Sequence, residues 1–452
     1  MAFDELRDTA ATLEAEIAAG PVVPNVAPQE IRDYLASRYD FSKPVVLDDV
    51  CDDVGQMLRK WQVHVTHPRY FGLFNPSVTI ASVVADAMVA MFNPQLAAWR
   101  SAPAPNEIER HTLGFLTKKI GLPGSSIATF TSGGAEANLS AIIVALTRAF
   151  PGYGENGLRS LPAAPAFYVS REAHHSFNKI AHMTGLGRQA LRPVATGPDL
   201  KMDLADLARR VSEDRRNGFT PFLVVGTAGT TGAGAIDPLE DLAAYCKAEG
   251  LWLHVDAAWG GAAVMSPRLR VHLAGIELAD SVTCDAHKWF SVSMAAGMFF
   301  CRHAEVVREA FRAETSYMPS KTAGPVFDPY TSSVQWSRRF IGLKLFLSLA
   351  ERGESGYVEQ IEHQACLGDI LRRSLKRAGW RIVNSSPFPV VCFTRDGLVP
   401  SKFLEELFAR QIAWMSQVQL GDRPPVLRAC ITSFRTTESD IESVVAEMSQ
   451  LG

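Results

Sequence analysis

Residues 251–258 read LWLHVDAA, and four of the first five of these residues are apolar. A short apolar run that ends at small residues is typical of a strand buried on both faces of a sheet. Further runs alternate with helical stretches such as EANLSAIIVALTRAF at 136–150; they are ATF at 128–130, AFYVS at 166–170, PFLVVGT at 221–227, DSVTCD at 280–285 and GMFFC at 297–301. This alternation predicts an α/β fold with a mostly parallel central sheet. Because ligands of such sheets bind at the carboxyl ends of the strands, we expect the functional site between residues 122 and 310.

The segments on either side of this region have other patterns. Apolar residues recur every three or four positions before residue 120, which predicts helices over 3–19, 46–62, 79–92 and 105–120. A polar segment, 313–336, separates the sheet region from a long helix expected from about Ser337. Beyond residue 375 the pattern predicts a small βαβ-like tail, with a helix over 401–419 and a capped helix from near Thr437. The chain is thus divided into an N-terminal helical segment (1–90), a large domain (91–370) and a small C-terminal α/β domain (371–452).

The composition is that of a globular protein. Of 452 residues 47% are hydrophobic, and 45 basic against 48 acidic residues leave a formal net charge of −3. The absence of a basic stripe in the sequence argues against nucleic acid as a partner. Seven scattered cysteines without a CxxC pair argue against disulfides and a metal site, and they suit a reducing compartment. With no signal-peptide pattern and no apolar run of about 18 residues, we expect a cytoplasmic protein without a membrane segment.

Four predicted loops carry residue types that are typical of catalytic and cofactor-binding sites. They are TSGGAEANLSA at 131–141, SREAHHSFNKIA at 170–181, LHVDAAWGGA at 253–262 and SVTCDAHKWFSV at 281–292. In the first loop Gly133 and Gly134 precede a helix, where small residues let backbone N–H groups approach a phosphate; a plain glycine turn is the alternative. In the second loop His174 can lie flat on a planar ring or be an ordinary loop residue.

The other two loops end strands with a charged residue. Asp256 stands among small residues, where a buried carboxylate needs a cationic partner unless it only caps the loop. Lys288 follows an apolar strand, and a lysine amine that loses its charge there can form a Schiff base; a solvated strand-end lysine is the alternative. A phosphate cradle, a stacking histidine, a carboxylate and a Schiff-base lysine together are what pyridoxal 5'-phosphate requires.

A second hypothesis comes from the glycine-rich run GTAGTTGAGAID at 226–237, which follows a predicted strand. Such a run can indicate a dinucleotide-binding oxidoreductase. The run lacks the GxGxxG spacing, however, and a dinucleotide site leaves Lys288 unexplained.

The order of the motifs carries a family resemblance. TSGGAEAN, AHHS, HVDAAWGG, DAHKW and the SRR at 337–339 occur in the same order as in the group II pyridoxal-phosphate-dependent amino-acid decarboxylases, which the chain resembles from His67 to the LRACITS run that includes Arg428. The resemblance implies fold type I, similar to the aspartate aminotransferases, and an obligate homodimer with active sites at the interface. Segment 1–90 is then expected to pack on the partner, and residues 92–99 to contribute to the partner's site.

The resemblance also implies roles for individual residues. Lys288 is expected to carry the cofactor as a Schiff base, Asp256 to pair with the pyridine nitrogen and His174 to stack on the ring. The remaining expected cofactor contacts are Gly134 and Ala135 at the phosphate, Ala258 and Thr227 near the ring, and His287 near the phosphate or substrate. Two departures stand out: Ala135 replaces a serine found in many relatives, and Asp285 replaces an asparagine found in some, so no phosphate contact is assigned to Asp285.

The expected reaction is decarboxylation of an L-amino acid to its amine and CO2. The resemblance makes Tyr317 the proton donor on a mobile loop and places Arg428 near the substrate carboxylate, although a strand-edge arginine is an equal alternative. The run FNPQLAAWRSAPAPNEIE at 92–109 favours an aromatic substrate, with Phe74 and Trp99 as pocket residues. Decarboxylation of 2,4-diaminobutyrate or of an acidic amino acid (glutamate, aspartate, cysteine sulfinate), aldehyde-forming oxidative decarboxylation and transamination stay open.

Overall fold

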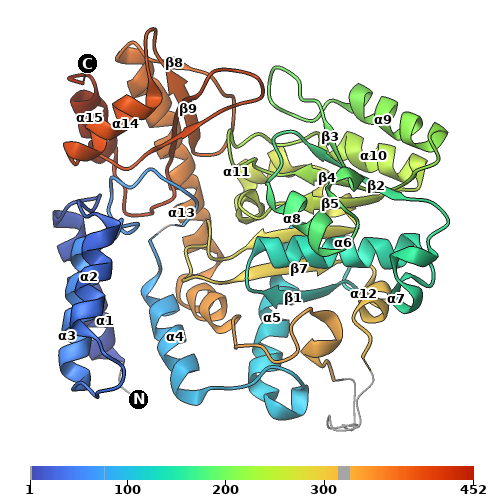
Figure 1. Cartoon of the computed structure of the whole chain (residues 1–452), viewed down its shortest axis with the longest axis horizontal. Helices are drawn as coiled ribbons and strands as arrows, with labels where there is room; N and C mark the ends of the chain where they lie inside the picture. The colour runs from blue at the N-terminus through green and yellow to red at the C-terminus, as the bar shows by residue number, and fades with distance from the viewer. Residues whose placement is uncertain (1–2, 76, 314–325, 452) are drawn as a thin grey trace.

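The computed structural model describes residues 3–75, 77–313 and 326–451. These residues form a seven-stranded central sheet in the order β1-β7-β6-β5-β4-β2-β3 (Figure 1). Its strands are β1 (Ile127–Thr131), β2 (Pro165–Ser170), β3 (Leu191–Val194), β4 (Thr220–Thr227), β5 (Trp252–Asp256), β6 (Ser281–Asp285) and β7 (Gly297–Cys301).

The strand directions place the candidate loops together. Neighbouring strands in the run β6-β5-β4-β2-β3 are parallel, whereas β7 is antiparallel to both β6 and β1. Strands β1 and β6 therefore point the same way, and their last residues, Thr131 and Asp285, are both paired with Gly297. The carboxyl ends of β1, β2, β4, β5 and β6 consequently lie along one edge, and the predicted mostly parallel α/β sheet is confirmed. The pattern did not indicate β3, an edge strand that contains Pro193.

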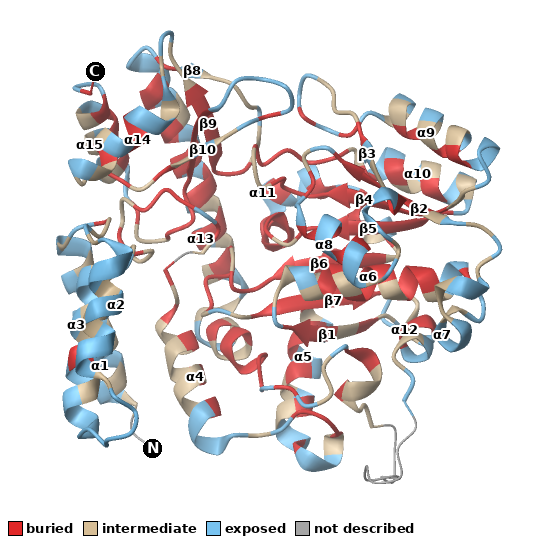
Figure 2. Ribbon diagram, viewed as in Figure 1, coloured by how far each residue is buried: buried red, intermediate tan, exposed pale blue. Residues whose placement is uncertain are grey.

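Helices cover both faces of the sheet, whose strands are buried almost throughout (Figure 2). The helices of this region are α5 (Pro103–Ile120), α6 (Gly134–Ala149), α7 (Tyr153–Asn156), α8 (Ser176–Met183), α9 (Leu204–Arg216), α10 (Leu239–Glu249), α11 (Pro267–Arg270), α12 (Ala304–Ala310) and α13 (Leu343–Arg377). Helix α6 turns Ala137, Ala141 and Ala145 toward the sheet, and all three are fully buried. Because these side chains are small and recur every four residues, α6 packs closely on β6 and β7.

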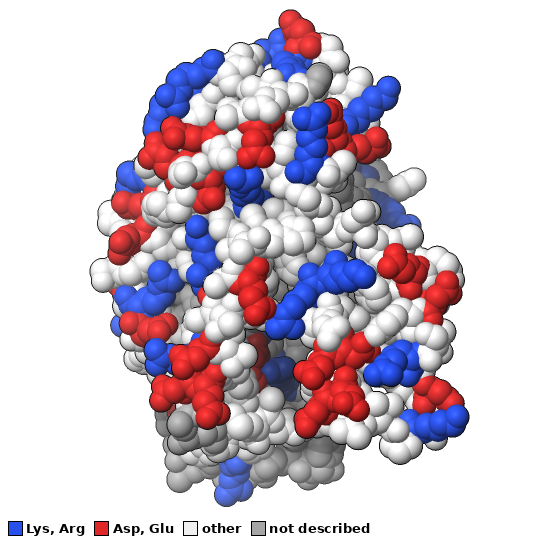
Figure 3. Space-filling model, turned by 90° about the vertical axis from the view of Figure 1, so that its left-hand side faces the viewer, with Lys and Arg blue, Asp and Glu red and all other residues white. Residues whose placement is uncertain are grey.

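Of the four N-terminal helices, α1 (Asp4–Ala19), α2 (Pro28–Arg38) and α3 (Leu47–Trp61) stand apart from the sheet and are largely exposed (Figures 1 and 2). The fourth, α4 (Ile80–Phe92), is mostly half-buried and packs on α13. The sequence pattern indicated α1, α3 and α4 but not α2, whose residues are mostly polar. On the face that carries these helices, acidic and basic side chains are interspersed with uncharged surface (Figure 3). Among the described helices, none has the length and apolar character needed to cross a membrane.

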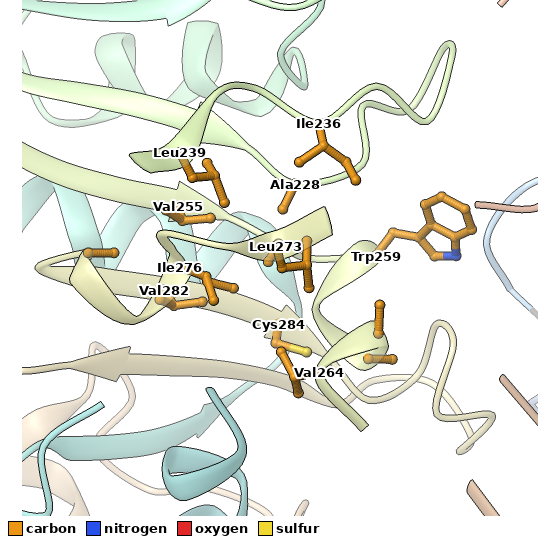
Figure 4. Packing of buried hydrophobic residues seen from close by; sticks show 14 of the residues in the cluster. Ala228, Ile236, Leu239, Val255, Trp259, Val264, Leu273, Ile276, Val282 and Cys284 are labelled. Atoms are coloured by element: carbon orange, nitrogen blue, oxygen red, sulfur yellow. The ribbon is translucent and has the colours of Figure 1, made fainter. Parts of the chain in front are cut away.

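Two apolar clusters form the core on the two faces of the sheet. One joins the sheet to α6, α8 and α12, and the other joins it to α5, α9, α10, α11 and α13. Figure 4 shows part of the second cluster, with Trp259 at its margin beyond Ala228. Since fully burying one large apolar side chain contributes roughly 1.5–3 kcal/mol, these clusters hold the strand ends in place.

Helix α13 begins later than the expected position near Ser337. Both carboxylate oxygens of buried Glu109 accept hydrogen bonds from Arg338, at 2.9 and 2.7 Å, and Oε1 also accepts one from the Gly342 amide at 2.9 Å. These bonds to α5 hold residues 338–342 outside a helix, so α13 starts at Leu343.

The C-terminal region contains a second, four-stranded sheet in the order β10-β11-β9-β8. Its elements are β8 (Arg381–Ile382), β9 (Val390–Thr394), α14 (Pro400–Ala409), β10 (Ser416–Val418), β11 (Val426–Cys430) and α15 (Glu438–Met448), the last capped by Thr437 as predicted. All strand pairs here are antiparallel, so the βαβ-like expectation is wrong. The helix expected over 401–419 is also too long: Gln411 has a φ of 56°, outside the helical region, and 416–418 pair with β11. The domain divisions at residues 90 and 370 stay a prediction.

Candidate active site

The strand ends bring the predicted residues to one edge of the sheet. Thr227 ends β4, Asp256 ends β5, and their Cα atoms are partners across the two strands. Lys288 lies in the turn after β6, and Gly134 begins α6 directly after β1. Residues that are up to about 150 positions apart in the chain thus meet at one edge of the sheet.

The lysine is paired with a carboxylate. Lys288 Nζ lies 3.0 Å from Asp285 Oδ2, three residues earlier in the chain. Asp285 is buried, and its Oδ1 accepts no hydrogen bond from the described residues. Sequence reasoning did not foresee this ion pair, because the spacing alone does not show whether the turn brings the two side chains together.

His287 is held beside the same carboxylate. Its Nδ1 accepts a hydrogen bond from the Ala296 amide at 3.1 Å, and its Nε2 lies 3.7 Å from Asp285 Oδ2. Burial lowers the pKa of His287, while the nearby Asp285 charge opposes that shift. Since its ring also lies near Gly133, His287 borders the start of α6.

The start of α6 has the properties of a phosphate site. The amides of Gly134 and Ala135 occupy the first helical positions, where backbone N–H groups have no acceptor within the helix. A Cβ atom on Gly134 would lie only 2.8 Å from Asp285 Oδ2, so glycine permits the close approach of α6 to β6. Ala135 is exposed, and its methyl side chain cannot donate a hydrogen bond. Only its amide is therefore available to a phosphate.

Asp256 is buried, and each of its oxygens receives a donor. The Ala258 amide donates to Oδ1 at 3.1 Å, and Asn138 Nδ2 donates to Oδ2 at 2.9 Å. Sequence reasoning did not identify Asn138, although it stands four residues after Gly134 on α6. A carboxylate held in this way retains lone pairs for a further cationic or N–H group.

His174 is exposed, and its Nδ1 accepts a hydrogen bond from the Ser176 amide at 3.2 Å. Loss of solvent around the imidazole lowers its pKa, and the charge of Asp256 acts in the opposite direction. A neutral imidazole beside a carboxylate can lie against an aromatic ring without bringing in a second charge.

Thr227 has a buried hydroxyl that makes no hydrogen bond with the described residues. Its amide donates to Asp237 Oδ2 at 2.7 Å, which holds the residue in place. Burial raises the pKa of Asp237 to about 6. An unpaired buried hydroxyl is costly, so the Thr227 side chain is suited to a polar group of a bound molecule.

Phe74 connects the lysine to Arg428. Its ring centroid lies 5.8 Å from Lys288 Nζ and 4.9 Å from Arg428 Cζ, and the ring stacks on Trp259 at 4.4 Å. Arg428 is buried; it donates to the carbonyls of Thr231 and Gly72, while its Nη2 has no partner among the described residues. The structure thus brings Phe74 and Arg428 to the lysine, together with Trp259, which the sequence did not single out.

One predicted residue is not brought to this cluster. Trp99 is half-buried, and its indole nitrogen donates to Glu107 at 2.9 Å while its amide donates to Asp328 at 2.7 Å. Tyr317 lies outside the described residues.

The arrangement fits pyridoxal 5'-phosphate. The amides at the start of α6 suit its phosphate, Asp256 suits its ring nitrogen, the unpaired Thr227 hydroxyl suits a polar ring substituent and Lys288 suits its aldehyde. An α/β sheet with these groups at one edge defines a pyridoxal-phosphate enzyme.

Comparison with known proteins identifies the family. The family described as "Pyridoxal-dependent decarboxylase conserved domain" matches residues 28–395. An aromatic-L-amino-acid decarboxylase of Bacillus atrophaeus is 28% identical over 401 residues, which cover 86% of this chain and 82% of the relative. A cysteine sulfinic acid decarboxylase of Homo sapiens is 32% identical over 338 residues, which cover 74% and 68%. The crystal structure of Oryza sativa TDC with PLP and tryptamine has a TM-score of 0.91 and 24% identity, covering 99% of this chain and 96% of that chain.

The chain belongs to the pyridoxal-dependent decarboxylase family. It has fold type I, its cofactor is pyridoxal 5'-phosphate, and it catalyses decarboxylation of an amino acid. The relatives act on both aromatic and acidic substrates, so the family does not identify the substrate.

Proposed function

We propose that the substrate is an aromatic L-amino acid, which is converted to its amine and CO2. The proposal rests on the Phe74 ring, which lies near the Lys288 amine and stacks on Trp259. Trp259 in turn stacks on Trp289 at 5.0 Å, so the three rings form a buried stack with Phe74 at the end nearest Lys288. A planar side chain bound near Lys288 would gain favourable contact with the Phe74 ring, which this stack holds in place.

The proposed roles of the polar residues follow from their positions. When bound, pyridoxal phosphate supplies an aldehyde that captures an amine and a ring that accepts the electrons left when CO2 departs. Lys288 would bind the aldehyde carbon between turnovers, Asp256 would hold a proton at the ring nitrogen, and His174 would lie against the ring. The amides of Gly134 and Ala135 would bind the phosphate near His287, and Ala258 and Thr227 would lie beside the ring.

Arg428 is proposed to bind the substrate carboxylate. Its guanidinium is fixed by two backbone carbonyls, and Nη2 retains N–H groups without a partner among the described residues. A preorganised guanidinium fits a carboxylate well, since its charge is already desolvated and oriented. The role of Tyr317 as proton donor, and with it the choice of amine over aldehyde as product, stays a prediction.

The same arginine favours a second candidate, an acidic amino acid. A side-chain carboxylate could use the Nη2 donor that the first proposal gives to the α-carboxylate, and the human relative is a cysteine sulfinic acid decarboxylase. An acidic substrate would leave the stacked rings without a planar partner.

A comparison of candidate substrates tests the proposal. CO2 release is measured for tryptophan, tyrosine, phenylalanine, glutamate, aspartate, cysteine sulfinate and 2,4-diaminobutyrate, with parallel assays for aldehyde, ammonia and keto acid. We expect the highest kcat/KM for an aromatic substrate and about a five-fold loss in Phe74→Leu, because a stacked aromatic pair contributes about 1 kcal/mol beyond its buried area. A higher kcat/KM for an acidic substrate, little affected by Phe74→Leu, would replace the proposal with the second candidate.

The assembly is proposed to be a homodimer with segment 1–90 packed on the partner. Asp53 is the only residue of α3 that is buried within the chain, although this helix carries several apolar residues. Leu47, Val54 and Leu58 of α3 are 72%, 39% and 53% exposed. A helix with an uncovered apolar face gains most of its stability from packing, and a second copy would supply it. In such a dimer Trp99 and the preceding residues would serve the partner's site; the cytoplasmic location also stays a prediction.

A further inference from the structure

A continuous line of buried hydrogen bonds lies behind Asp256. Asn138 Nδ2 donates to Asp256 Oδ2 at 2.9 Å, and Asn138 Oδ1 lies 3.0 Å from His254 Nε2. On the other side of the imidazole, His254 Nδ1 lies 2.9 Å from Ser281 Oγ, which accepts a hydrogen bond from Trp252 Nε1 at 2.9 Å. All these side chains are buried, and His254 and Ser281 have no exposed surface.

The direction of each bond follows from the two ends of the line. A carboxylate has no proton to donate, so Asn138 must turn its NH2 group toward Asp256 and its carbonyl toward His254. His254 Nε2 therefore carries the proton. At the other end the indole nitrogen of Trp252 can only donate, so the Ser281 hydroxyl is free to donate its own proton to His254 Nδ1. Every donor in the line points toward Asp256.

The imidazole in the middle is suited to this arrangement. Burial lowers the pKa of His254 to about 4, and the neutral ring has one donor and one acceptor, as the line requires. The Thr283 hydroxyl lies 3.4 Å from Nε2, a longer contact that leaves Asn138 as the nearer partner.

The line also links the two ends of the cofactor site. Asn138 is one helical turn after Gly134 on α6, so the helix that presents amides to a phosphate also presents a donor to Asp256. Strand β5 supplies His254 and strand β6 supplies Ser281. Together with Asn138 on α6, they tie the position of the Asp256 carboxylate to three elements of the core.

We propose that Asn138, His254 and Ser281 are positioning residues that orient the Asp256 carboxylate toward the ring nitrogen of the cofactor. This inference rests on the role proposed above for Asp256. It adds that the contact between Asp256 and the pyridine nitrogen depends on three side chains that do not themselves touch the cofactor. A hydrogen-bonded carboxylate that cannot rotate offers its remaining lone pairs in one direction only.

The test uses the full-length protein stripped of cofactor and titrated with pyridoxal 5'-phosphate. In Asn138→Leu and His254→Leu we expect affinity for the cofactor to fall about ten-fold, since one buried hydrogen bond to a charged group is lost or misdirected. The visible absorption of the bound cofactor should also change its pH dependence. His254→Gln places an amide nitrogen near the position of Nε2, so it should recover most of the affinity and the wild-type spectrum.

A matched control separates positioning from general stability. Tyr168→Phe removes another buried hydrogen bond of the same sheet, from Tyr168 Oη to Asp214 at 2.7 Å. It should lower the melting temperature without changing the spectrum. Ser281→Ala is a milder substitution in the same line of hydrogen bonds, and it replaces the leucine variants in the test if these do not fold. It should lower the affinity for the cofactor, as expected for His254→Leu.

Two outcomes decide between the inference and the role on which it rests. If Asp256→Asn changes the spectrum while the Asn138, His254 and Ser281 variants bind the cofactor as wild type does, the positioning line is wrong. If Asp256→Asn itself leaves affinity and spectrum unchanged, the proposed role of Asp256 is wrong and the line loses its function with it.

Discussion

At the scale of single residues, Lys288, the proposed Schiff-base lysine, is defined by an ion pair with its neighbour. Asp285 holds the Lys288 ammonium at 3.0 Å, and the same carboxylate lies against the start of α6. An ammonium cannot attack a carbonyl until it loses its proton, so in the proposed role cofactor binding would release Lys288 from this ion pair.

Lys288→Ala should abolish CO2 release and the visible absorption of the cofactor complex, because no other amine can take the same position in this loop. The measurements are an absorption spectrum after addition of pyridoxal phosphate and a CO2 assay. Lys119→Ala, which breaks an ion pair with Glu354 elsewhere on the surface, is the control and should keep both properties. A Lys288→Ala protein that still decarboxylates would refute the assignment.

A second residue-scale prediction concerns acid stability. Burial, with a smaller contribution from Arg69, lowers the pKa of His67 from 6.5 to about 4. The unfolded chain therefore binds the proton at higher pH than the folded chain, so the stability from His67 is complete above about pH 6.5 and is lost as the pH falls toward 4. At pH 5 the loss should be on the order of 2 kcal/mol.

The measurement is the free energy of unfolding by denaturant, at pH 7 and at pH 5, for the wild type and for His67→Gln. The variant should lose less stability between the two pH values, by about that amount. Comparing the two proteins is necessary because His254 shifts stability in the same direction and Asp237, with a raised pKa, in the opposite direction. Equal losses in both proteins would show that His67 is not the source.

At the scale of elements, α6 unites the site. Its small residues bring it close to the sheet, its first amides face the proposed phosphate position, and Asn138 on its second turn reaches Asp256. In the proposed site, the distance between α6 and β6 would therefore affect the contacts at both ends of the cofactor.

Gly134→Ala should weaken cofactor binding at least ten-fold, because the added methyl group would lie 2.8 Å from Asp285 Oδ2 and 3.2 Å from Ala258 Cβ. Titration of the cofactor-free protein measures the change. Gly114→Ala is the matched control: this exposed helical position has nothing within 4 Å of the new methyl group, so the variant should be more stable by about 1 kcal/mol with unchanged affinity. Unchanged affinity in Gly134→Ala would mean that α6 does not bind the phosphate.

At the scale of the whole molecule, the proposed dimer accounts for the exposed apolar face of α3. The exposed apolar residues of α3 recur on one side of the helix, at positions 47, 54 and 58. The double variant Leu47→Glu with Leu58→Glu should therefore shift the protein from dimer to monomer and lower activity, since it places charges in the proposed interface.

Sedimentation of wild type and variant at several concentrations measures the shift. Leu278→Glu is the control, because Leu278 is 50% exposed but lies beside the central sheet, far from α3 in the sequence. A wild-type protein that sediments as a monomer at all concentrations, yet decarboxylates, would contradict the dimer.

The sequence by itself determined six of the seven strands of the central sheet, all but β3, and the loops that end them. Buried parallel strands have to be apolar along their whole length, and the chemistry that follows them needs particular residue types, so both signals are local. Lys288, Asp256 and Gly134 could be found in this way. The antiparallel C-terminal sheet could not, because short apolar runs do not specify strand direction.

Only the tertiary structure decided which side chains act together. Arg428 is fixed by the carbonyl of Gly72, 356 residues earlier, and Asn138 meets His254 across 116 residues. The Lys288–Asp285 pair is local in sequence, yet it depends on the turn after β6. Such contacts depend on how helices and strands pack, and no periodicity of apolar residues encodes the direction of a buried hydrogen bond.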